Sequence, residues 1–184
     1  MTGLNLNTRI NLEKAEVLLL DEAHEGMAVL MQIVSAFGVR SVRRCRSAEE
    51  AKKEALGVPF DLILIGANGH DSSSCDFIRW LRRSGLEPNA FTPTILISGH
   101  TQLRNVQRAV DCGANYIVAK PVSPDVLLER ILWVARERRP FISCASYVGP
   151  DRRFHDIGPP QGAAERRNSE PAADVAAQTQ GAVR

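Results

Sequence analysis

The chain of 184 residues lacks several features that would each indicate a specific class of protein. No apolar run approaches the length of a membrane-spanning helix, so the sequence offers no candidate transmembrane segment. The formal net charge is only +2, too small to predict binding to nucleic acid or membranes by bulk charge. Residues 1–14 are polar and contain no apolar core of a signal peptide.

Paired cysteines are absent as well. The four cysteines are far apart, and none forms a CxxC pair: Cys45, Cys75, Cys112 and Cys144. Such spacing predicts neither a disulfide framework nor a zinc site. We therefore expect a reduced protein in the cytoplasm.

What is present is the composition of a soluble domain, with 44% hydrophobic and 24% charged residues. Short apolar runs alternate with longer runs of helical periodicity. The apolar runs predict strands at residues 16–21, 39–44, 61–65, 94–98 and 116–119. The periodic runs predict helices at residues 25–37, 47–57, 76–83, 103–110 and 124–138.

Local signals mark the ends of these helices. Gly38, Gly85 and Gly113 each follow a periodic run and predict its end. Ser47 and the glutamate three residues later form the pattern of a capping box. Pro124 directly after a serine predicts the first turn of the last helix.

Strands alternating with helices predict an α/β fold, a flavodoxin-like doubly wound five-stranded parallel sheet. We expect an N-terminal extension at residues 1–14, this domain at 15–139 and a C-terminal tail at 140–184. The tail is rich in Arg, Pro and Ala, and we expect it to be mostly disordered from Gly158 onward. In such sheets the functional site lies at the carboxyl ends of the strands.

The residues at those strand ends carry a resemblance. The first strand is followed by Asp21 and Glu22, the third by Gly66, the fourth ends at Ser98, and the fifth precedes Lys120 and a proline. In this order the chain, over residues 15–138, resembles the CheY-like receiver domain of bacterial two-component response regulators.

The resemblance implies a role for each matching position. In the family the acidic pair, here Asp21 and Glu22, binds magnesium, while the residues matching Ser98 and Lys120 contact the phosphoryl group. The phosphoacceptor aspartate stands where this chain has Gly66, which has no carboxylate. We therefore expect a pseudo-receiver outside ordinary phosphorelay chemistry, with weakened magnesium affinity and no enzymatic activity.

Other interpretations of these residues stay open. Asp71, in the loop beyond Gly66, is an alternative phosphoacceptor. Lys120 could simply pair with Asp21 or Glu22. The family often has an aromatic residue three positions before the lysine, but this chain has Ile117 there, so the usual aromatic relay is expected to be absent.

Without phosphorylation, signalling would proceed by protein contact. We expect a kinase, a regulator or a motor-type target to bind the face formed by the fourth helix, fifth strand and fifth helix. Homodimers through that region are also compatible with the resemblance. We expect no DNA-binding domain after the receiver and therefore no direct transcriptional output. Candidate exposed residues on the face are Gln102, Arg104, Arg108 and Arg130.

The tail offers an alternative function. Arginine forks bind phosphates and guanine edges, and aromatic rings add stacking surfaces. This composition suits cyclic di-GMP, which some similar single-domain receivers bind through arginine-rich C-terminal segments. A solvated, charged tail is the competing interpretation. The candidate nucleotide-binding residues are Tyr147, Arg152, Arg153, Phe154, Arg166 and Arg167.

Overall fold

The computed structural model describes residues 12–67, 73–99, 103–136 and 139–152, with the side chains of 103–105 excepted. The strands are β1 (Glu16–Leu20), β2 (Ser41–Cys45), β3 (Leu62–Ala67), β4 (Thr94–Ser98), β5 (Tyr116–Ala119), β6 (Phe141–Ser143) and β7 (Val148–Pro150). The helices are α1 (His24–Ala36), α2 (Ala48–Gly57), α3 (Ser73–Arg83), α4 (Leu103–Asp111) and α5 (Pro124–Arg136), with a short 3₁₀ helix η1 (Asn89–Phe91).

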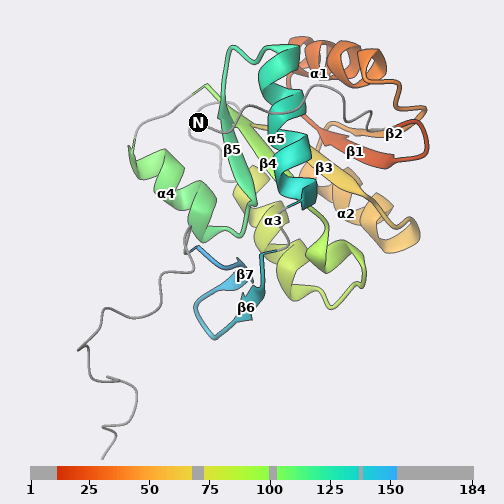
Figure 1. Cartoon of the computed structure of the whole chain (residues 1–184). Helices are drawn as coiled ribbons and strands as arrows, with labels where there is room; N and C mark the ends of the chain where they lie inside the picture. Colours follow the sequence, from red (N-terminus) through yellow and green to blue (C-terminus); the bar gives the residue numbers. More distant parts are fainter. Residues whose placement is uncertain (1–11, 68–72, 100–102, 137–138, 153–184) are drawn as a thin grey trace, which may run out of the picture. The chain divides into compact units, whose positions relative to one another are not determined.

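The first five strands form one parallel sheet in the order β2-β1-β3-β4-β5 (Figure 1). This is the doubly wound order of flavodoxin-like folds, and the prediction of the fold class is confirmed. All five predicted strands and all five predicted helices are present, with ends that differ by a few residues. In the described part of the chain no helix is long and apolar enough to cross a membrane.

Alternating strand residues separate the core into two layers. Leu18, Ile63 and Ile65 pack with residues of α2 and α3, whereas Leu19 and Leu64 pack with residues of α1 and α5. Neighbouring residues of a strand point to opposite faces, so a sheet covered on both faces needs strands that are apolar throughout. This requirement explains why β1, β3 and β4 contain so few polar residues, whereas the edge strand β2 contains Arg43 and Arg44.

The predicted helix signals are largely confirmed. Gly38, Gly85 and Gly113 all have positive φ. Helices commonly end with a residue in this conformation, and glycine adopts it most easily. Ser47 caps α2 by accepting a hydrogen bond from the Glu50 amide at 3.2 Å. The capping box is not reciprocal, however, because the Glu50 carboxylate accepts from the Arg46 amide and not from the Ser47 amide.

The segment that follows α5 contains regular structure that the sequence patterns did not predict. β6 and β7 form an antiparallel hairpin, closed by hydrogen bonds between the backbones of Cys144 and Tyr147. The hairpin contacts α3 through β7, and Gly149 lies directly against Gly113. Residues 153–184, including those expected to be disordered, lie outside the described residues.

A buried arginine ties the hairpin region to the sheet. Arg82 of α3 is 4% exposed and donates hydrogen bonds to oxygens of η1, of β4 and of the residues before β5. Burial lowers the pKa of Arg82 to about 10, so it stays charged at neutral pH. Its guanidinium carbon lies 5.2 Å from the ring centre of Phe141, which covers it.

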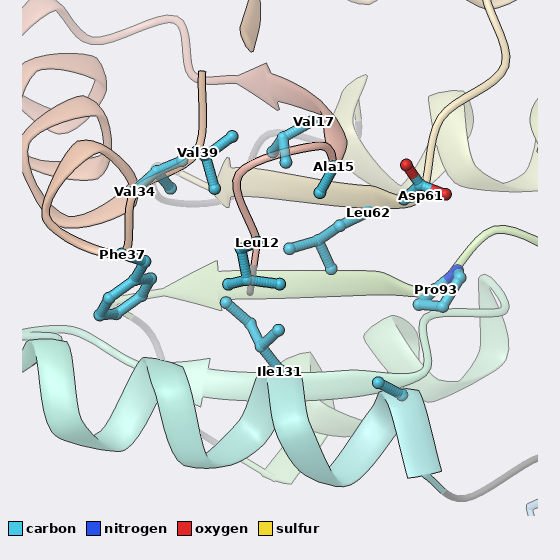
Figure 2. A pocket seen from close by; sticks show the side chains of 11 residues that line it. Leu12, Ala15, Val17, Val34, Phe37, Val39, Asp61, Leu62, Pro93 and Ile131 are labelled. Atoms are coloured by element: carbon cyan, nitrogen blue, oxygen red, sulfur yellow. The ribbon is translucent and has the colours of Figure 1, made fainter. Parts of the chain in front are cut away.

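A small apolar cavity of about 140 Å³ lies at the amino ends of the strands, the edge opposite to the expected site. Figure 2 shows the side chains of Leu12 and Ile131 facing each other across it. Leu12, the first described residue, therefore packs over the start of β1 and β3.

Candidate functional site

The structure brings the predicted strand-end residues together at the carboxyl edge of the sheet. β3 continues through Gly66 to Ala67, so Gly66 lies inside the strand and not after it. Ala67 pairs with Ser98 of β4, and Ser98 pairs with Ala119 of β5. Lys120 follows directly and donates its backbone N–H to the Ser98 carbonyl at 2.8 Å.

Asp21 is fully enclosed at the centre of this cluster, with an exposed fraction of 0%. Its Oδ1 accepts a hydrogen bond from the Ala23 amide at 2.9 Å. Its Oδ2 lies 3.5 Å from the Nζ of Lys120. Of the two partners that the sequence left open for Lys120, the structure therefore shows Asp21.

Two glycines make room for this carboxylate. A Cβ atom added to Gly66 would lie 3.0 Å from the Cβ of Asp21 and closer still to its carboxylate. A Cβ added to Gly26, in the first turn of α1, would lie 2.7 Å from the Cγ of Asp21. Side chains do not approach one another so closely, so Asp21 needs glycine on both sides.

Gly26 is a site residue that reasoning from the sequence missed. It stands inside a run with helical periodicity, where glycine costs about 0.5–1 kcal/mol relative to alanine. An isolated glycine in a helix often marks a close approach of another group. That signal was present in the sequence, but only the fold shows that the group is Asp21.

Glu22 is exposed, in contrast to the enclosed Asp21. Its carboxylate accepts a hydrogen bond from the hydroxyl of Ser73, the first residue of α3, at 2.9 Å. The acidic pair predicted to bind magnesium is thus divided between an enclosed carboxylate and an exposed one.

These donors do not fit a magnesium ion. Magnesium needs several oxygen ligands in octahedral geometry at about 2.0–2.1 Å. Asp21 faces the Lys120 ammonium and two glycines, and position 66 supplies no carboxylate oxygen. Among the described residues, no three His, Cys, Asp or Glu side chains gather in a way that could hold a metal. Asp71, the alternative acid, lies outside the described residues.

A groove that the sequence did not indicate opens beside this cluster. Its volume is about 350 Å³, and it runs between α1 and the residues that follow β5. Val29 and Ile97 contribute apolar wall, while Glu25 and Lys120 line it with opposite charges.

Ile117 occupies the position, three residues before Lys120, where the family often has an aromatic residue. Ile117 packs toward α2 and α3, whereas Tyr116 packs toward α1 and α5. Tyr116, the neighbour of Ile117 in β5, therefore faces the other side of the sheet. Its ring makes an edge contact with Trp133 at 5.3 Å between ring centres.

The face formed by α4, β5 and α5 carries two of the predicted arginines. Arg108 is exposed on α4. Arg130 is partly exposed on α5, and its guanidinium carbon lies 5.1 Å from the ring centre of Tyr116. Gln102 and the side chain of Arg104 lie outside the described part of the structure.

Of the candidate nucleotide-binding residues, two are described. Tyr147 is 8% exposed, and its hydroxyl donates to the Pro150 carbonyl at 2.7 Å. The guanidinium of Arg152 stacks on the Tyr147 ring at 3.8 Å and pairs with Asp111 at 2.7 Å. Both side chains therefore have partners within the domain. Arg153, Phe154, Arg166 and Arg167 lie outside the described residues.

Comparison with known proteins identifies the family. Residues 17–132, more than half of the chain, match the response regulator receiver domain. The chain belongs to this family. The resemblance inferred from Asp21, Ser98 and Lys120 is thereby confirmed.

Two curated proteins show similarity in sequence. A nitrate/nitrite response regulator protein homolog of Haemophilus influenzae is 29% identical over 128 residues, covering 67% of this chain and 58% of that protein. Protein-glutamate methylesterase/protein-glutamine glutaminase 1 of Myxococcus xanthus is 29% identical over 109 residues, covering 59% of this chain and 30% of that protein. The chain thus spans less than two thirds of either relative.

Solved receivers share the fold. The chemotaxis response regulator CheY4 of Vibrio cholerae matches with a TM-score of 0.58 and 23% identity, covering 65% of this chain and 98% of that one. A CheY-like receiver domain protein of Methanospirillum hungatei matches with a TM-score of 0.56 and 22% identity, covering 65% and 91%. The CheY-like, flavodoxin-like fold follows from these matches.

Proposed function

We propose that this receiver acts in two-component-type signalling without being phosphorylated, and that it transmits its signal by contact with a protein partner. The observation that carries the proposal is the position of Asp21. Its carboxylate fills the space beside Gly66 where a phosphoacceptor side chain would begin. We also propose that the protein is a binding module and not an enzyme, and that it works in the cytoplasm, where its four free cysteines stay reduced.

The chemistry supports this proposal. Formation of an acyl phosphate needs an accessible carboxylate oxygen that attacks phosphorus, with cationic groups placed around the phosphoryl oxygens. Asp21 is enclosed, and its charge is balanced by Lys120. In the family, the lysine at this position contacts the phosphoryl group. Here the ammonium of Lys120 instead forms an ion pair with Asp21.

The first test is a phosphorylation assay of the full chain with acetyl phosphate and magnesium, read by intact mass. We expect no added phosphoryl group. An acyl phosphate mapped to Asp21, Glu22 or Asp71, and released by hydroxylamine, would overturn the proposal. A matched variant combines Gly66→Asp with Asp21→Ala, which supplies a carboxylate at position 66 and removes the group that fills its space.

We propose the surface of α4, β5 and α5 as the contact for a kinase, a regulator or a motor-type target. Arg108 and Arg130 lie on it, and the guanidinium of Arg130 is held by Tyr116. An arginine held in place by an aromatic ring loses less entropy when it binds a carboxylate. A partner with an acidic surface fits these charges.

This contact is testable in cells that contain the native partner. A photo-crosslinking amino acid is placed at Arg108, and a control is placed at Leu56 of α2, which is 66% exposed. We expect a defined covalent adduct from position 108 that is absent from position 56. Equal yields from both positions would count against this surface.

Binding of cyclic di-GMP stays a prediction from the sequence. The described residues favour protein contact, because Tyr147 and Arg152 already pack on the domain. Calorimetric titration of the nucleotide into the full chain tests it, with Arg152→Ala plus Arg153→Ala as the matched variant. Affinity that is lost in the variant would establish the alternative function.

A further inference from the structure

The apolar cavity at the amino ends of the strands is built from residues that are far apart in the sequence (Figure 2). Five buried side chains line it, namely Val17 of β1, Val34 of α1, Val39 before β2, Leu62 of β3 and Ile131 of α5. All five belong to the core layer that the sheet forms with α1 and α5. The walls are therefore part of the packed core and not of a surface loop.

The size of the cavity suits a single aromatic ring. Its volume is about 140 Å³. In another protein, an engineered cavity of about 150 Å³ with walls of Leu, Ile and Phe stays dry and binds benzene or xenon. The walls here have the same character, with Val, Leu and Ile side chains and the ring of Phe37.

The walls offer little to a water molecule. A water molecule in a cavity needs about two to four polar partners. Asp61 contributes a charged side chain, but this residue is exposed, and its Oδ2 already accepts a hydrogen bond from the Glu16 amide at 2.9 Å. The side chains of Val17, Leu62 and Ile131 have no polar atoms. The chemistry of the walls thus favours an apolar occupant.

Two physical effects favour such an occupant over empty space. Atoms that line an empty cavity have no dispersion contacts on the side that faces it. An apolar ring supplies those contacts, and it also leaves water, which is favourable for apolar surface. Neither effect requires a change in the backbone of the surrounding strands.

We propose that this cavity is a binding site for a small apolar molecule of about the size of one aromatic ring. The site lies at the amino ends of the strands, whereas Asp21 and Lys120 lie at the carboxyl ends. Binding needs no residue of the degenerate phosphorylation site, so the inference does not depend on the proposed function. The ligand contacts Ile131 of α5, one of the elements of the proposed contact surface.

The rim provides the ligand with a route of entry. Leu12 and Phe37 line the cavity and are only partly buried, and Ala135 is exposed. Figure 2 shows Leu12 facing Ile131 across the cavity. Side chains that are partly exposed change rotamer rapidly, so Leu12 or Phe37 can turn aside while the sheet stays intact.

The test is a titration of the full chain with benzene, followed by NMR of labelled Ile, Leu and Val methyl groups. We expect saturable shifts at Val34, Leu62 and Ile131, with a Kd on the order of 1 mM for a ligand of so few atoms. Ile78 and Leu81, in the core layer on the other face of the sheet, should shift little. The melting temperature should rise with the benzene concentration, because the ligand binds the folded chain.

Two further probes test the chemistry of the site. Pyridine has the shape of benzene but carries a nitrogen acceptor, which the apolar walls leave without a partner. We expect it to bind about tenfold more weakly than benzene or less tightly still. Xenon has no polar group, and under pressure it should shift the same methyl groups as benzene.

Filled variants place the site. Ala135→Leu and Ala15→Leu each add a larger apolar side chain to the wall, and we expect the benzene shifts to be lost while the fold is kept. Ala28→Leu, at an exposed position of α1 outside the cavity, is the control and should bind as the native chain does. Circular dichroism checks each fold, and the comparison of benzene with pyridine in the native chain decides if a filled variant does not fold.

Another occupant is available within the chain. Residues 1–11 lie outside the described residues and contain Leu4, Leu6 and Ile10. If the native chain shows no benzene shifts but a variant with serine at these three positions does, this segment fills the cavity and the proposal is overturned. Shifts that fail to saturate, shifts spread equally over both core layers, or equal affinities for benzene and pyridine would overturn it as well.

Discussion

The carboxylate of Asp21 lies against Gly66, in the space that any side chain at position 66 would need. Asp21 comes from the end of β1 and Gly66 from the neighbouring strand β3, and Gly26 of α1 closes the opposite side. The carboxylate of Asp21 therefore fills the space between these two glycines, and a larger residue at either position would overlap it.

Substitution of Gly66 by alanine should destabilise the protein. The new Cβ would overlap Asp21, and overpacking of a core typically costs about 1–3 kcal/mol. Thermal or denaturant unfolding measures the loss. Gly57→Ala is the matched control, because a Cβ there meets nothing within 4 Å. Equal stability of the two variants would show that Asp21 moves aside without cost.

Lys120→Met should also lower the stability, because it leaves the enclosed Asp21 charge without its 3.5 Å partner. Breaking a buried pair costs about 3–5 kcal/mol, and we expect about 2 kcal/mol here because Lys120 is partly exposed. Lys53→Met at an exposed position is the control. In the double variant Lys120→Met with Asp21→Asn, much of the loss should be recovered. Additive losses would argue against a coupled pair.

Gly149→Ala should detach the hairpin of β6 and β7 from the domain. A Cβ at this position would lie 2.9 Å from the Cα of Gly113 and 2.6 Å from the hydroxyl of Tyr147. We expect faster hydrogen exchange in β6 and β7 with little change in β1 and β3. Ser146→Ala in the exposed turn is the control and should exchange like the native chain.

Alkaline pH should destabilise the fold through Cys45. Burial raises its pKa from 9.0 to about 11. Between these values the unfolded chain ionises Cys45 while the folded chain does not. Its contribution is therefore present in full below pH 9 and lost as the pH rises to 11, by about 2–3 kcal/mol at 1.36 kcal/mol per pKa unit.

Denaturant unfolding at several pH values measures how the free energy of unfolding changes with pH. The variant Cys45→Ala should lack the part of this change that Cys45 causes. The variant and the native chain should converge in their pH dependence below pH 9. An unchanged slope between pH 9 and 11 in Cys45→Ala would assign the effect to other groups.

Much of the fold could be predicted because it depends on local patterns. The apolar runs of β1, β3 and β4 mark strands covered on both faces, and Gly38, Gly85 and Gly113 mark helix ends. The hairpin could not be predicted in this way. Its strands have three residues each, too short for a periodic signal, and its stability comes from contacts with α3 and Gly113.

The sequence by itself determined the order of the elements, the residues at each strand end and the absence of a carboxylate at position 66. These depend on residue type and on spacing along the chain. Only the tertiary structure decided that Asp21 is enclosed by Gly26 and Gly66 and that Lys120 is its partner. Such contacts join residues from different elements, and side-chain packing, which spacing along the chain does not record, brings them together.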